Sequence, residues 1–306
     1  MPKPDLRHAK AYVVTGPTSG IGRLAALELA KHGTVILAGR DRAKLDVMQR
    51  RIVRGGGKAV AVTLDLSDVA SARRAAAEIA ALHLPIAGVL NNAGMREAVP
   101  TKSAQGWDRT FATNHLGPFA FTEALIPHLA DGTTIVFVVS AVENPERPMA
   151  KRAGFLGGRY ISAEASARGE WKSPNSKVPG FDSYATSKQA ALAAALELAR
   201  ENPRLRVNAV EPGLIMNTGL SRHASLRMRI RAHVIFPLVQ PFVKAMSTQS
   251  KASRLLARLM RNDAGATGIY YDESGDAMKQ TSQEVRDPDF TKRVVAETRA
   301  LLAEVG

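Results

Sequence analysis

The fold of this chain is decided by the stretch Ala11-Tyr12-Val13-Val14-Thr15-Gly16-Pro17-Thr18-Ser19-Gly20-Ile21-Gly22. A continuously apolar run leads directly into a turn with three glycines, and a helical pattern follows over Gly20–His32. Glycines let the backbone turn sharply and approach a bound group, and the unpaired N–H groups at the start of a helix attract an anion. Taken alone, such a turn is as often a plain connection. As the first strand-to-helix turn of an α/β sheet, it indicates a site for a pyrophosphate.

The alternation of strand-like and helical patterns continues along the chain. Strands are expected at Ala11–Thr15, Thr34–Ala38, Lys58–Leu64, Ile86–Asn91, Thr133–Val139, Leu205–Val210 and Gly268–Tyr271. Helices are expected at Gly20–His32, Arg42–Arg54, Ser67–Leu82, Ala104–Leu129 and Ser183–Glu201. Strands that are apolar throughout, with helical crossovers between them, are buried on both faces. We therefore predict an α/β fold, a single doubly wound Rossmann-type domain over residues 1–306 with about seven parallel strands and helices on both faces.

Two segments interrupt this alternation. Residues 143–182 are rich in glycine, proline, serine and charged side chains, and we expect them to form a long inserted loop. Residues 217–262 are basic, apolar and helix-like, with breaks at Pro237 and Pro241. Both segments follow a strand, so we expect both at the carboxyl edge of the sheet, where open α/β folds bind their ligands.

The composition excludes several classes of protein. Of the 306 residues, 45% are hydrophobic and 23% are charged, which is typical of a globular domain. The absence of cysteine excludes disulfides, cysteine-ligated zinc, iron–sulfur clusters and thiol catalysis. The seven histidines show no ligand-like spacing, so no metal site is expected. The polar start Met1–Lys10, and the lack of any uncharged apolar stretch of about 18 residues, predict no signal peptide, no membrane-spanning helix and a cytoplasmic location.

The charge is strongly basic, with 42 Lys and Arg against 28 Asp and Glu, and it is concentrated in one segment. Ser221–Arg261 carries nine Lys or Arg and no acidic residue. Three interpretations stay open: this segment covers a greasy substrate pocket, packs in the core with a solvated basic face, or makes a peripheral contact with an anionic membrane surface. The apolar residues concerned are Leu226, Met228, Ile230, Val234, Ile235, Phe236, Leu238, Val239, Phe242 and Val243. No nucleic-acid partner is expected, because no helix-turn-helix or RNA-binding signature is present.

The second strand ends in Leu37-Ala38-Gly39-Arg40-Asp41. An acidic residue at this place would hydrogen-bond a ribose 2′-hydroxyl, whereas an arginine suits a 2′-phosphate. Because Arg40 is the first charged residue, the pattern favours NADP(H) over NAD(H). A solvated arginine at the start of the next helix is the less favoured interpretation, and Asp41 weakens the argument slightly.

Tyr184-Ala185-Thr186-Ser187-Lys188 places a phenol and an ammonium group one helical turn apart. A nearby cation favours the phenolate, so we expect Lys188 to lower the pKa of Tyr184 toward a value useful for acid–base catalysis. Ser140 ends the run Ile135–Val139, where its hydroxyl could hold a substrate carbonyl. Each feature is weak by itself, because chance supplies such pairs and strands commonly end in a serine.

Together and in this order, the motifs resemble those of the short-chain dehydrogenase/reductase family. The resemblance covers about residues 9–220 and rests on Thr15–Gly22, Asp65-Leu66, Asn91-Asn92-Ala93-Gly94, Asn114 with Gly117, Ser140, Tyr184, Lys188, and Pro212-Gly213 followed by Thr218. Ala38-Gly39-Arg40-Asp41, the run Asn114–Phe119 and the late Gly268–Tyr271 before a C-terminal helix resemble the branch of retinol dehydrogenases and protochlorophyllide reductase.

The resemblance implies hydride transfer between a nicotinamide and a carbonyl or alcohol carbon, a ketoreductase type of chemistry. It implies the catalytic residues Asn114, Ser140, Tyr184 and Lys188, with Asn114 holding a water that connects Lys188 to solvent. It also implies a cofactor site made of Gly16, Thr18, Ser19, Gly20, Ile21, Gly22, Arg40, Asp65, Leu66, Asn92, Ala93, Gly94, Tyr184, Lys188, Pro212, Gly213 and Thr218. No step requires a metal.

The expected partner is a small but bulky hydrophobic carbonyl or alcohol, and a homo-oligomer could form through Ala104–Leu129 and Ser183–Glu201. Three alternatives stay open. The same tyrosine and lysine could serve a reductase of a carbon–carbon double bond. A nucleotide-sensing regulator would use the fold without catalysis. The third alternative is an epimerase or dehydratase acting on a nucleotide sugar, and the tight spacing of Gly16, Gly20 and Gly22 argues against the longer-spaced glycine loop of those enzymes.

Overall fold

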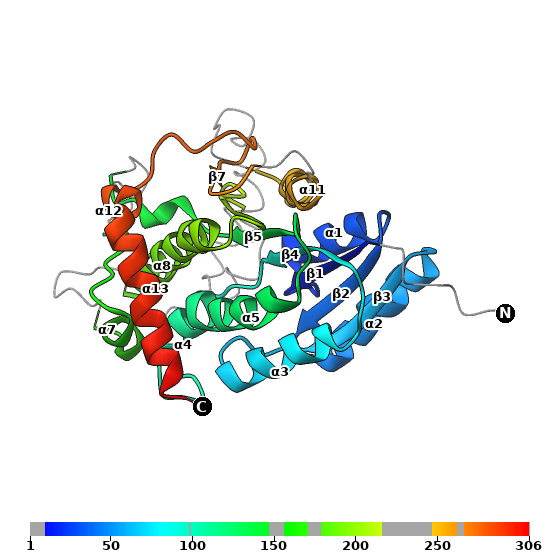
Figure 1. Cartoon of the computed structure of the whole chain (residues 1–306), viewed down its shortest axis with the longest axis horizontal. Coiled ribbons are helices and arrows are strands. Elements are labelled where there is room, and N and C mark those ends of the chain that lie inside the picture. The colour runs from blue at the N-terminus through cyan, green and yellow to red at the C-terminus, as the bar shows by residue number, and fades with distance from the viewer. Residues whose placement is uncertain are drawn as a thin grey trace, which may run out of the picture.

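The computed structural model describes residues 10–97, 99–146, 156–170, 179–215, 247–261 and 266–305. Seven strands form one sheet in the order β3-β2-β1-β4-β5-β6-β7, and every neighbouring pair is parallel. Their bounds are β1 Ala11–Thr15, β2 Thr34–Gly39, β3 Lys58–Thr63, β4 Ile86–Asn91, β5 Thr134–Val138, β6 Arg206–Val210 and β7 Tyr270–Tyr271. Helices cover both faces of the sheet (Figure 1). The predicted α/β fold of doubly wound type is therefore confirmed.

The two faces can be followed in the alternating side chains of β1. Ala11 and Val13 belong to one hydrophobic core, whereas Tyr12 and Val14 belong to the other. Successive side chains of a strand point to opposite faces, so a central strand that is apolar throughout is packed on both sides.

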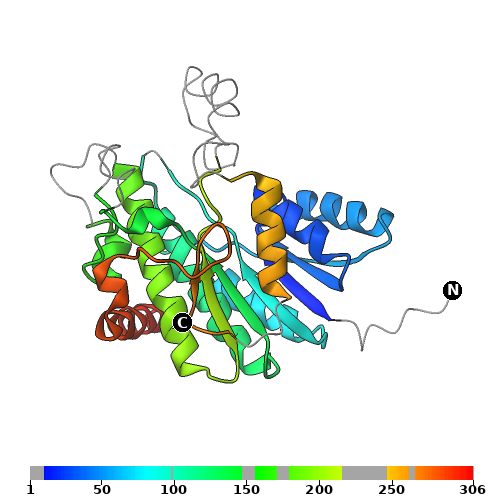
Figure 2. The same ribbon diagram turned by 90° about the horizontal axis from the view of Figure 1, so that it is seen from above.

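The first core is covered by α3 Val69–Ala80, α5 Gly117–Leu125, α8 Pro179–Glu201 and α13 Pro288–Ala303, and the second by α1 Gly20–Leu29, α2 Arg42–Arg54 and α11 Gln249–Met260. Figure 2 shows α1 and α11 on the side of the sheet opposite to α8 and α13.

The sheet order reverses beside β1. The chain runs from β1 outward to β2 and β3, and then returns to β4 on the other side of β1. The chain leaves β1 toward α1 on one face of the sheet and leaves β4 toward α5 on the other face. Ligands of open α/β sheets bind in the crevice at such a point. This topology places the turn after Thr15 beside the loop after Asn91.

The predicted helix Ala104–Leu129 is wrong at both ends and in the middle. The structure begins it at α4 Arg109–Phe111, passes through a π-helical turn η1 Ala112–Leu116 into α5, and ends in the 3₁₀ turn η2 Ile126–His128. The side chain of Asp108 caps the start by accepting from the N–H of Phe111 at 2.8 Å. Pro127 lies in the last turn, where its ring cannot continue a regular helix.

Part of the predicted inserted loop is helical. α7 spans Ala163–Arg168, where Ser162 accepts from the N–H of Ala165 at 3.0 Å and Gly169 ends the helix with φ +85°. A serine before a helix and a left-handed glycine after it are ordinary capping signals. α8 also starts earlier than expected, at Pro179. Other short elements are η3 Ala141–Glu143 and α12 Gln283–Arg286.

The C-terminal helix α13 lies against α8 and α7 (Figure 1). Arg299 donates to Glu123 of α5 at 2.7 Å and to both carboxylate oxygens of Glu201 of α8 at 2.8 and 2.6 Å. The buried His115 of η1 contacts the hydroxyl of Thr298 at 2.9 Å. The helices expected to form an oligomer are thus covered by a helix of the same chain.

Candidate active site

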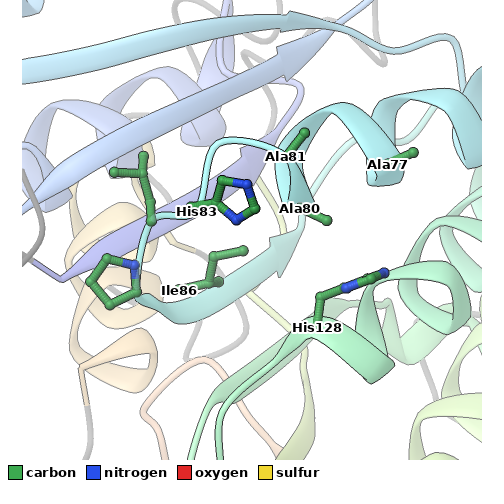
Figure 3. A pocket seen from close by; sticks show the side chains of 8 residues that line it. Ala77, Ala80, Ala81, His83, Ile86 and His128 are labelled. Carbon is green, nitrogen blue, oxygen red and sulfur yellow. The ribbon is translucent and has the colours of Figure 1, made fainter.

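The predicted site residues that the structure describes gather at the carboxyl ends of β1 to β6. Because the strands are parallel, these ends share one edge of the sheet. The hollow in Figure 3, about 680 Å³ in volume, is a different place. It lies beside Ile86, the first residue of β4, and His128 of η2, at the opposite edge of the sheet. The candidate active site is therefore built from the rim residues and not from this hollow.

The glycines of the turn after β1 are required by backbone conformation or by close packing. Gly16 and Gly20 have φ of +65° and +55°, the left-handed region that glycine adopts without strain. A Cβ on Gly22 would lie 2.3 Å from Nδ2 of Asn92 and 2.5 Å from the backbone oxygen of Gly16. The turn is thus pressed against the loop after β4, and it opens into α1, whose cap residue Ser19 makes no side-chain cap hydrogen bond.

Thr15 joins the loops after β1 and β4. Its hydroxyl oxygen accepts from the N–H groups of Asn92 and Ala93, both at 3.0 Å, and its backbone oxygen accepts from Nδ2 of Asn92 at 2.9 Å. The same hydroxyl donates to the backbone oxygen of Leu90 at 3.3 Å. The structure therefore brings the predicted Asn92-Ala93-Gly94 segment to the glycine turn.

At the end of β2, Arg40 and Asp41 have different surroundings. The carboxylate of Asp41 caps α2 by accepting from the backbone N–H of Lys44 at 3.1 Å. It also forms an ion pair with Nζ of Lys44 at 2.5 Å. These hydrogen bonds hold the pKa of Asp41 below its usual value. Arg40, by contrast, is exposed at the rim beside Gly39.

Asp65 and Leu66 form the next part of the rim, after β3. The carboxylate of Asp65 accepts from the N–H and the hydroxyl of Ser67 at 2.9 and 2.7 Å, so it is held in place by its own turn. Leu66 is buried, and its backbone oxygen would lie 2.0 Å from a Cβ on Gly117, so the start of α5 must be a glycine here.

Ser140, Tyr184 and Lys188 come together at the carboxyl end of β5. The side chains of Ser140 and Tyr184 are hydrogen-bonded to each other. Nζ of Lys188 donates to the backbone oxygen of Val138 at 2.8 Å and lies 5.6 Å from the centroid of the Tyr184 ring. Tyr184 and Lys188 lie one turn apart on α8, and Ser140 reaches them from the end of β5. A hydroxyl, a phenol and an ammonium group thus form one cluster.

Asn114 lies in the π-helical turn η1 and connects this cluster to the loop after β4. Its Oδ1 accepts from the N–H of Met95 at 2.8 Å, and its Nδ2 donates to the backbone oxygen of Met95 at 2.9 Å and to the hydroxyl of Ser187 at 3.0 Å. A Cβ on Gly94 would be 3.3 Å from both Oδ1 of Asn114 and Nζ of Lys188. Single π turns inside helices are often found at functional sites.

Comparison with known proteins identifies the family of this chain. A family profile described as short chain dehydrogenase matches residues 10–151. A short-chain dehydrogenase/reductase of Armillaria gallica is 31% identical over 301 residues, with 95% of this chain and 89% of that one covered. The chain belongs to the short-chain dehydrogenase/reductase family. Human retinol dehydrogenase 13 is 29% identical over 301 residues, covering 96% of this chain and 84% of that protein, which places the chain in the retinol dehydrogenase-like branch.

Among similar solved structures, a protein from Beutenbergia cavernae described as an NAD(P)-dependent gluconate 5-dehydrogenase has a TM-score of 0.66 and 26% identity. The match covers 88% of this chain and 97% of that one, and that structure holds NADP at low occupancy.

Electrostatics at the cluster differ from the prediction for this short-chain dehydrogenase/reductase. Burial is the largest cause that raises the pKa of Tyr184 above its ordinary value, and the carboxylate of Glu211 raises it further. The Ser140 hydroxyl and the Arg96 guanidinium act in the opposite direction and do not compensate. Burial lowers the pKa of Lys188 to about 8. The expected lowering of the pKa of Tyr184 is therefore wrong for this structure, because burial and the charge of Glu211 outweigh the Ser140 hydrogen bond and the charge of Arg96.

Sequence reasoning missed three residues around Tyr184. The guanidinium carbon of Arg96 lies 4.6 Å from the centroid of the Phe181 ring, and that ring meets the Tyr184 ring edge-on at 6.1 Å. Glu211, directly after β6, is buried and accepts from the N–H of Ala141. Only Phe181 had a sequence signal, because it precedes Tyr184 by one helical turn.

The remaining predicted positions can be placed only in part. Gly213, the third residue after β6, has φ +86°, as a tight turn at this rim requires, and Pro212 precedes it. Thr218 and the apolar residues between positions 226 and 243 lie outside the described residues. Within the described ranges, no group of three or more metal-ligating side chains is found, and no helix is both long and apolar enough to cross a membrane.

Proposed function

We propose that this protein is an NADP(H)-dependent oxidoreductase that interconverts a carbonyl and an alcohol on a bulky hydrophobic substrate, with Tyr184 as the acid–base residue. The observation that carries the proposal is the cluster of Ser140, Tyr184, Lys188 and Asn114 on the same rim of the sheet as the glycine turn. The family supplies the oxidoreductase class, and the cluster suggests how the chemistry is done.

The glycine turn fits a dinucleotide. Gly22 lacks the room for a Cβ, Gly16 and Gly20 adopt left-handed backbone, and the start of α1 is uncapped by a side chain. Such a cradle lets backbone N–H groups meet a pyrophosphate. The residues proposed to hold the cofactor are Gly16, Thr18, Ser19, Gly20, Ile21, Gly22, Arg40, Asp65, Leu66, Asn92, Ala93, Gly94, Tyr184, Lys188, Pro212, Gly213 and Thr218.

The preference for NADP(H) rests on the end of β2. Asp41, the acidic residue that could reject a 2′-phosphate, is engaged by the start of α2 and by Lys44. The exposed Arg40 is the charged side chain left at this rim, and a guanidinium suits a phosphate dianion. NADP in the related Beutenbergia cavernae structure supports the same choice.

In the reductive direction the bound nicotinamide supplies a hydride to the carbonyl carbon. The Ser140 hydroxyl donates a hydrogen bond to the carbonyl oxygen, and Tyr184 transfers its phenolic proton to that oxygen, which gives the alcohol. A raised pKa keeps Tyr184 protonated at neutral pH, as an acid needs to be. Lys188 stabilises the phenolate that is left, and Asn114 fixes the loop carrying Gly94 against α8. Reprotonation through a water beside Asn114 completes the cycle.

A bulky hydrophobic substrate is proposed from the apolar residues of 217–246 and from the retinol dehydrogenase named among the relatives. The function is tested with purified protein, NADPH and retinal, following loss of nicotinamide absorbance. NADPH-dependent reduction that Tyr184→Phe abolishes supports the proposal. NADPH binding with no turnover of retinal or of other bulky aldehydes and ketones contradicts it. A cytoplasmic location and a peripheral membrane contact through 221–261 stay predictions.

A further inference from the structure

A buried carboxylate stands beside the proposed catalytic cluster without a place in the mechanism above. Glu211 directly follows β6 and is only 8% exposed. Its backbone N–H donates to the backbone oxygen of Tyr271 in β7 at 2.8 Å. Its side chain turns to the neighbouring strand and accepts from the N–H of Ala141, the first residue of η3. Burying a carboxylate is unfavourable unless hydrogen bonds and charge compensate it, so this placement needs a reason.

The contact of Glu211 has a counterpart made by Lys188. Ser140 lies between Val138, whose backbone oxygen accepts from Nζ of Lys188 at 2.8 Å, and Ala141, whose N–H donates to Glu211. A buried cation thus holds the backbone on one side of Ser140 and a buried anion holds it on the other. Opposite charges in a site with little water stabilise each other more than at a surface.

On the basis of the proposed function, we propose that Glu211 is a positioning residue that fixes the backbone behind Ser140 through Ala141 and is the buried counter-charge of Lys188. It does not touch the reacting atoms. Its role is to hold the hydroxyl of Ser140 in register with the phenol of Tyr184, and to balance the charge that Lys188 brings into the protein interior.

The direction of the electrostatic effects agrees with this role. Burial lowers the pKa of Lys188 to about 8, and Glu211 opposes that fall. Glu211 also raises the pKa of Tyr184, which Arg96 lowers from the loop after β4. The other carboxylate nearby, the buried Glu143 of η3, accepts from the N–H of Ser282 at 3.2 Å. Removing the charge of Glu211 should therefore let both Lys188 and Tyr184 lose their protons at lower pH.

The first test reads Lys188 directly and needs neither cofactor nor substrate. Protein carrying isotope-labelled lysine ε-carbons is titrated by NMR, and the Lys188 resonance is assigned by its loss in Lys188→Met. Glu211→Gln keeps an acceptor oxygen for Ala141 and removes the charge, so the midpoint, near pH 8 in the unaltered protein, should fall by about one unit. An unchanged midpoint would overturn the proposal.

The matched control is Glu197→Gln. Glu197 is also a buried carboxylate of this chain, but it accepts from Arg200 and from the Thr291 hydroxyl at the far end of α8. Its substitution should leave the Lys188 midpoint in place. A shift of similar size in this variant would show that any buried carboxylate acts on Lys188, and would also overturn the specific role of Glu211.

The second test separates positioning from a general structural role. For NADPH-dependent reduction of retinal, Glu211→Gln should move the alkaline limb of the kcat profile to lower pH, because Lys188 and Tyr184 both ionise earlier. Glu211→Ala should show the same shift and, in addition, about a tenfold lower kcat at every pH, since the N–H of Ala141 loses its acceptor. A lower kcat at every pH with an unmoved limb contradicts the proposal. Absence of turnover in the unaltered protein refutes the proposed function instead, while the NMR titration still decides the role of Glu211.

Discussion

Nζ of Lys188 lies 5.6 Å from the centroid of the Tyr184 ring while donating a hydrogen bond to the backbone oxygen of Val138 at 2.8 Å. The cation is buried, and the strand end that holds it also carries Ser140. Replacing Lys188 by methionine keeps most of the side-chain volume and removes the charge. We expect kcat for retinal reduction to fall at least about a hundredfold. Lys188→Arg, which keeps the charge, should retain more activity than Lys188→Met, and equal activity of the two variants would contradict the electrostatic role.

The exposed Arg40 is predicted to select the cofactor. Arg40→Ala should raise the KM for NADPH by about tenfold to a hundredfold, the value of one or two charge-assisted hydrogen bonds, and leave the KM for NADH nearly unchanged. The matched control is Arg42→Ala, because Arg42 lies two residues from Arg40. Its guanidinium donates to the carboxylate of Asp46 at 3.0 Å and to the backbone oxygen of Ala61 at 3.1 Å. Equal shifts of both KM values in Arg40→Ala would show that the 2′-phosphate is bound elsewhere.

The glycine turn offers a pair of substitutions with different expected outcomes. A Cβ on Gly22 would collide with Asn92 and with the backbone of Gly16, so Gly22→Ala must displace the turn and should abolish NADPH binding. Gly20 has φ +55° and nothing within 4 Å of its Cβ position, so Gly20→Ala should cost only about 1 kcal/mol of stability from backbone strain. NADPH binding is followed by nicotinamide fluorescence and unfolding by circular dichroism. Normal binding by Gly22→Ala would contradict the proposed cradle.

The buried His115 should make the stability depend on pH. Burial lowers its pKa to about 3, against 6.5 for an ordinary histidine, so between these values the unfolded chain binds the proton and the folded protein does not. Stability should therefore be complete above pH 6.5 and fall as the pH drops below it, with a slope up to about 1.4 kcal/mol per pH unit from this residue.

The contribution of His115 is isolated by His115→Gln, which offers a polar side chain for the contact with Thr298. Denaturant unfolding of both proteins is measured at a series of pH values. The free energies of unfolding should converge as the pH falls below 6.5, because the variant lacks the group that titrates. Parallel curves for the two proteins would show that His115 does not carry the acid sensitivity.

The cover that α13 places over α5 and α8 is predicted to prevent pairing through these helices. A single side chain of α13, that of Arg299, contacts both Glu123 of α5 and Glu201 of α8. Cross-linking with mass spectrometry should find no links between α5 or α8 of one chain and the same helices of another. Light scattering that shows a dimer, with cross-links in α5 or α8, would restore the oligomer expected from the family resemblance.

Much of the fold could be predicted from the sequence because the strands are apolar throughout and each is followed by a helix. Val35, Ile36 and Leu37 are all fully buried, and such a run has no other stable place than a central strand. The helix over 104–129 was misjudged because its apolar pattern continues through a change of helix type. The cap at Asp108 was a readable signal for its true start, whereas the π turn around Asn114 depends on contacts with Met95 and Ser187 that no local pattern reveals.

The candidate site, like the fold, could be predicted only in part from the sequence. Tyr184 and Lys188 share one helix, so their spacing alone brought them together. Glu211 and Ala141 meet only because β5 and β6 pair in a register that carries Val139 beside Val210, with an N–H to oxygen distance of 2.9 Å. Burial and the charges of Glu211 and Arg96 decide the direction of the pKa shift of Tyr184, and both charged residues come from loops that are distant from Tyr184 in the sequence.

The central claim is that Tyr184 is the proton donor in a reaction that consumes NADPH. The most direct measurement compares the unaltered protein with Tyr184→Phe in two assays: NADPH binding by fluorescence and single-turnover reduction of retinal. The variant lacks only the phenolic hydroxyl, so NADPH binding should stay within about twofold while the rate of reduction falls by about a hundredfold or more. Near-normal reduction by Tyr184→Phe, with NADPH bound, would contradict the account.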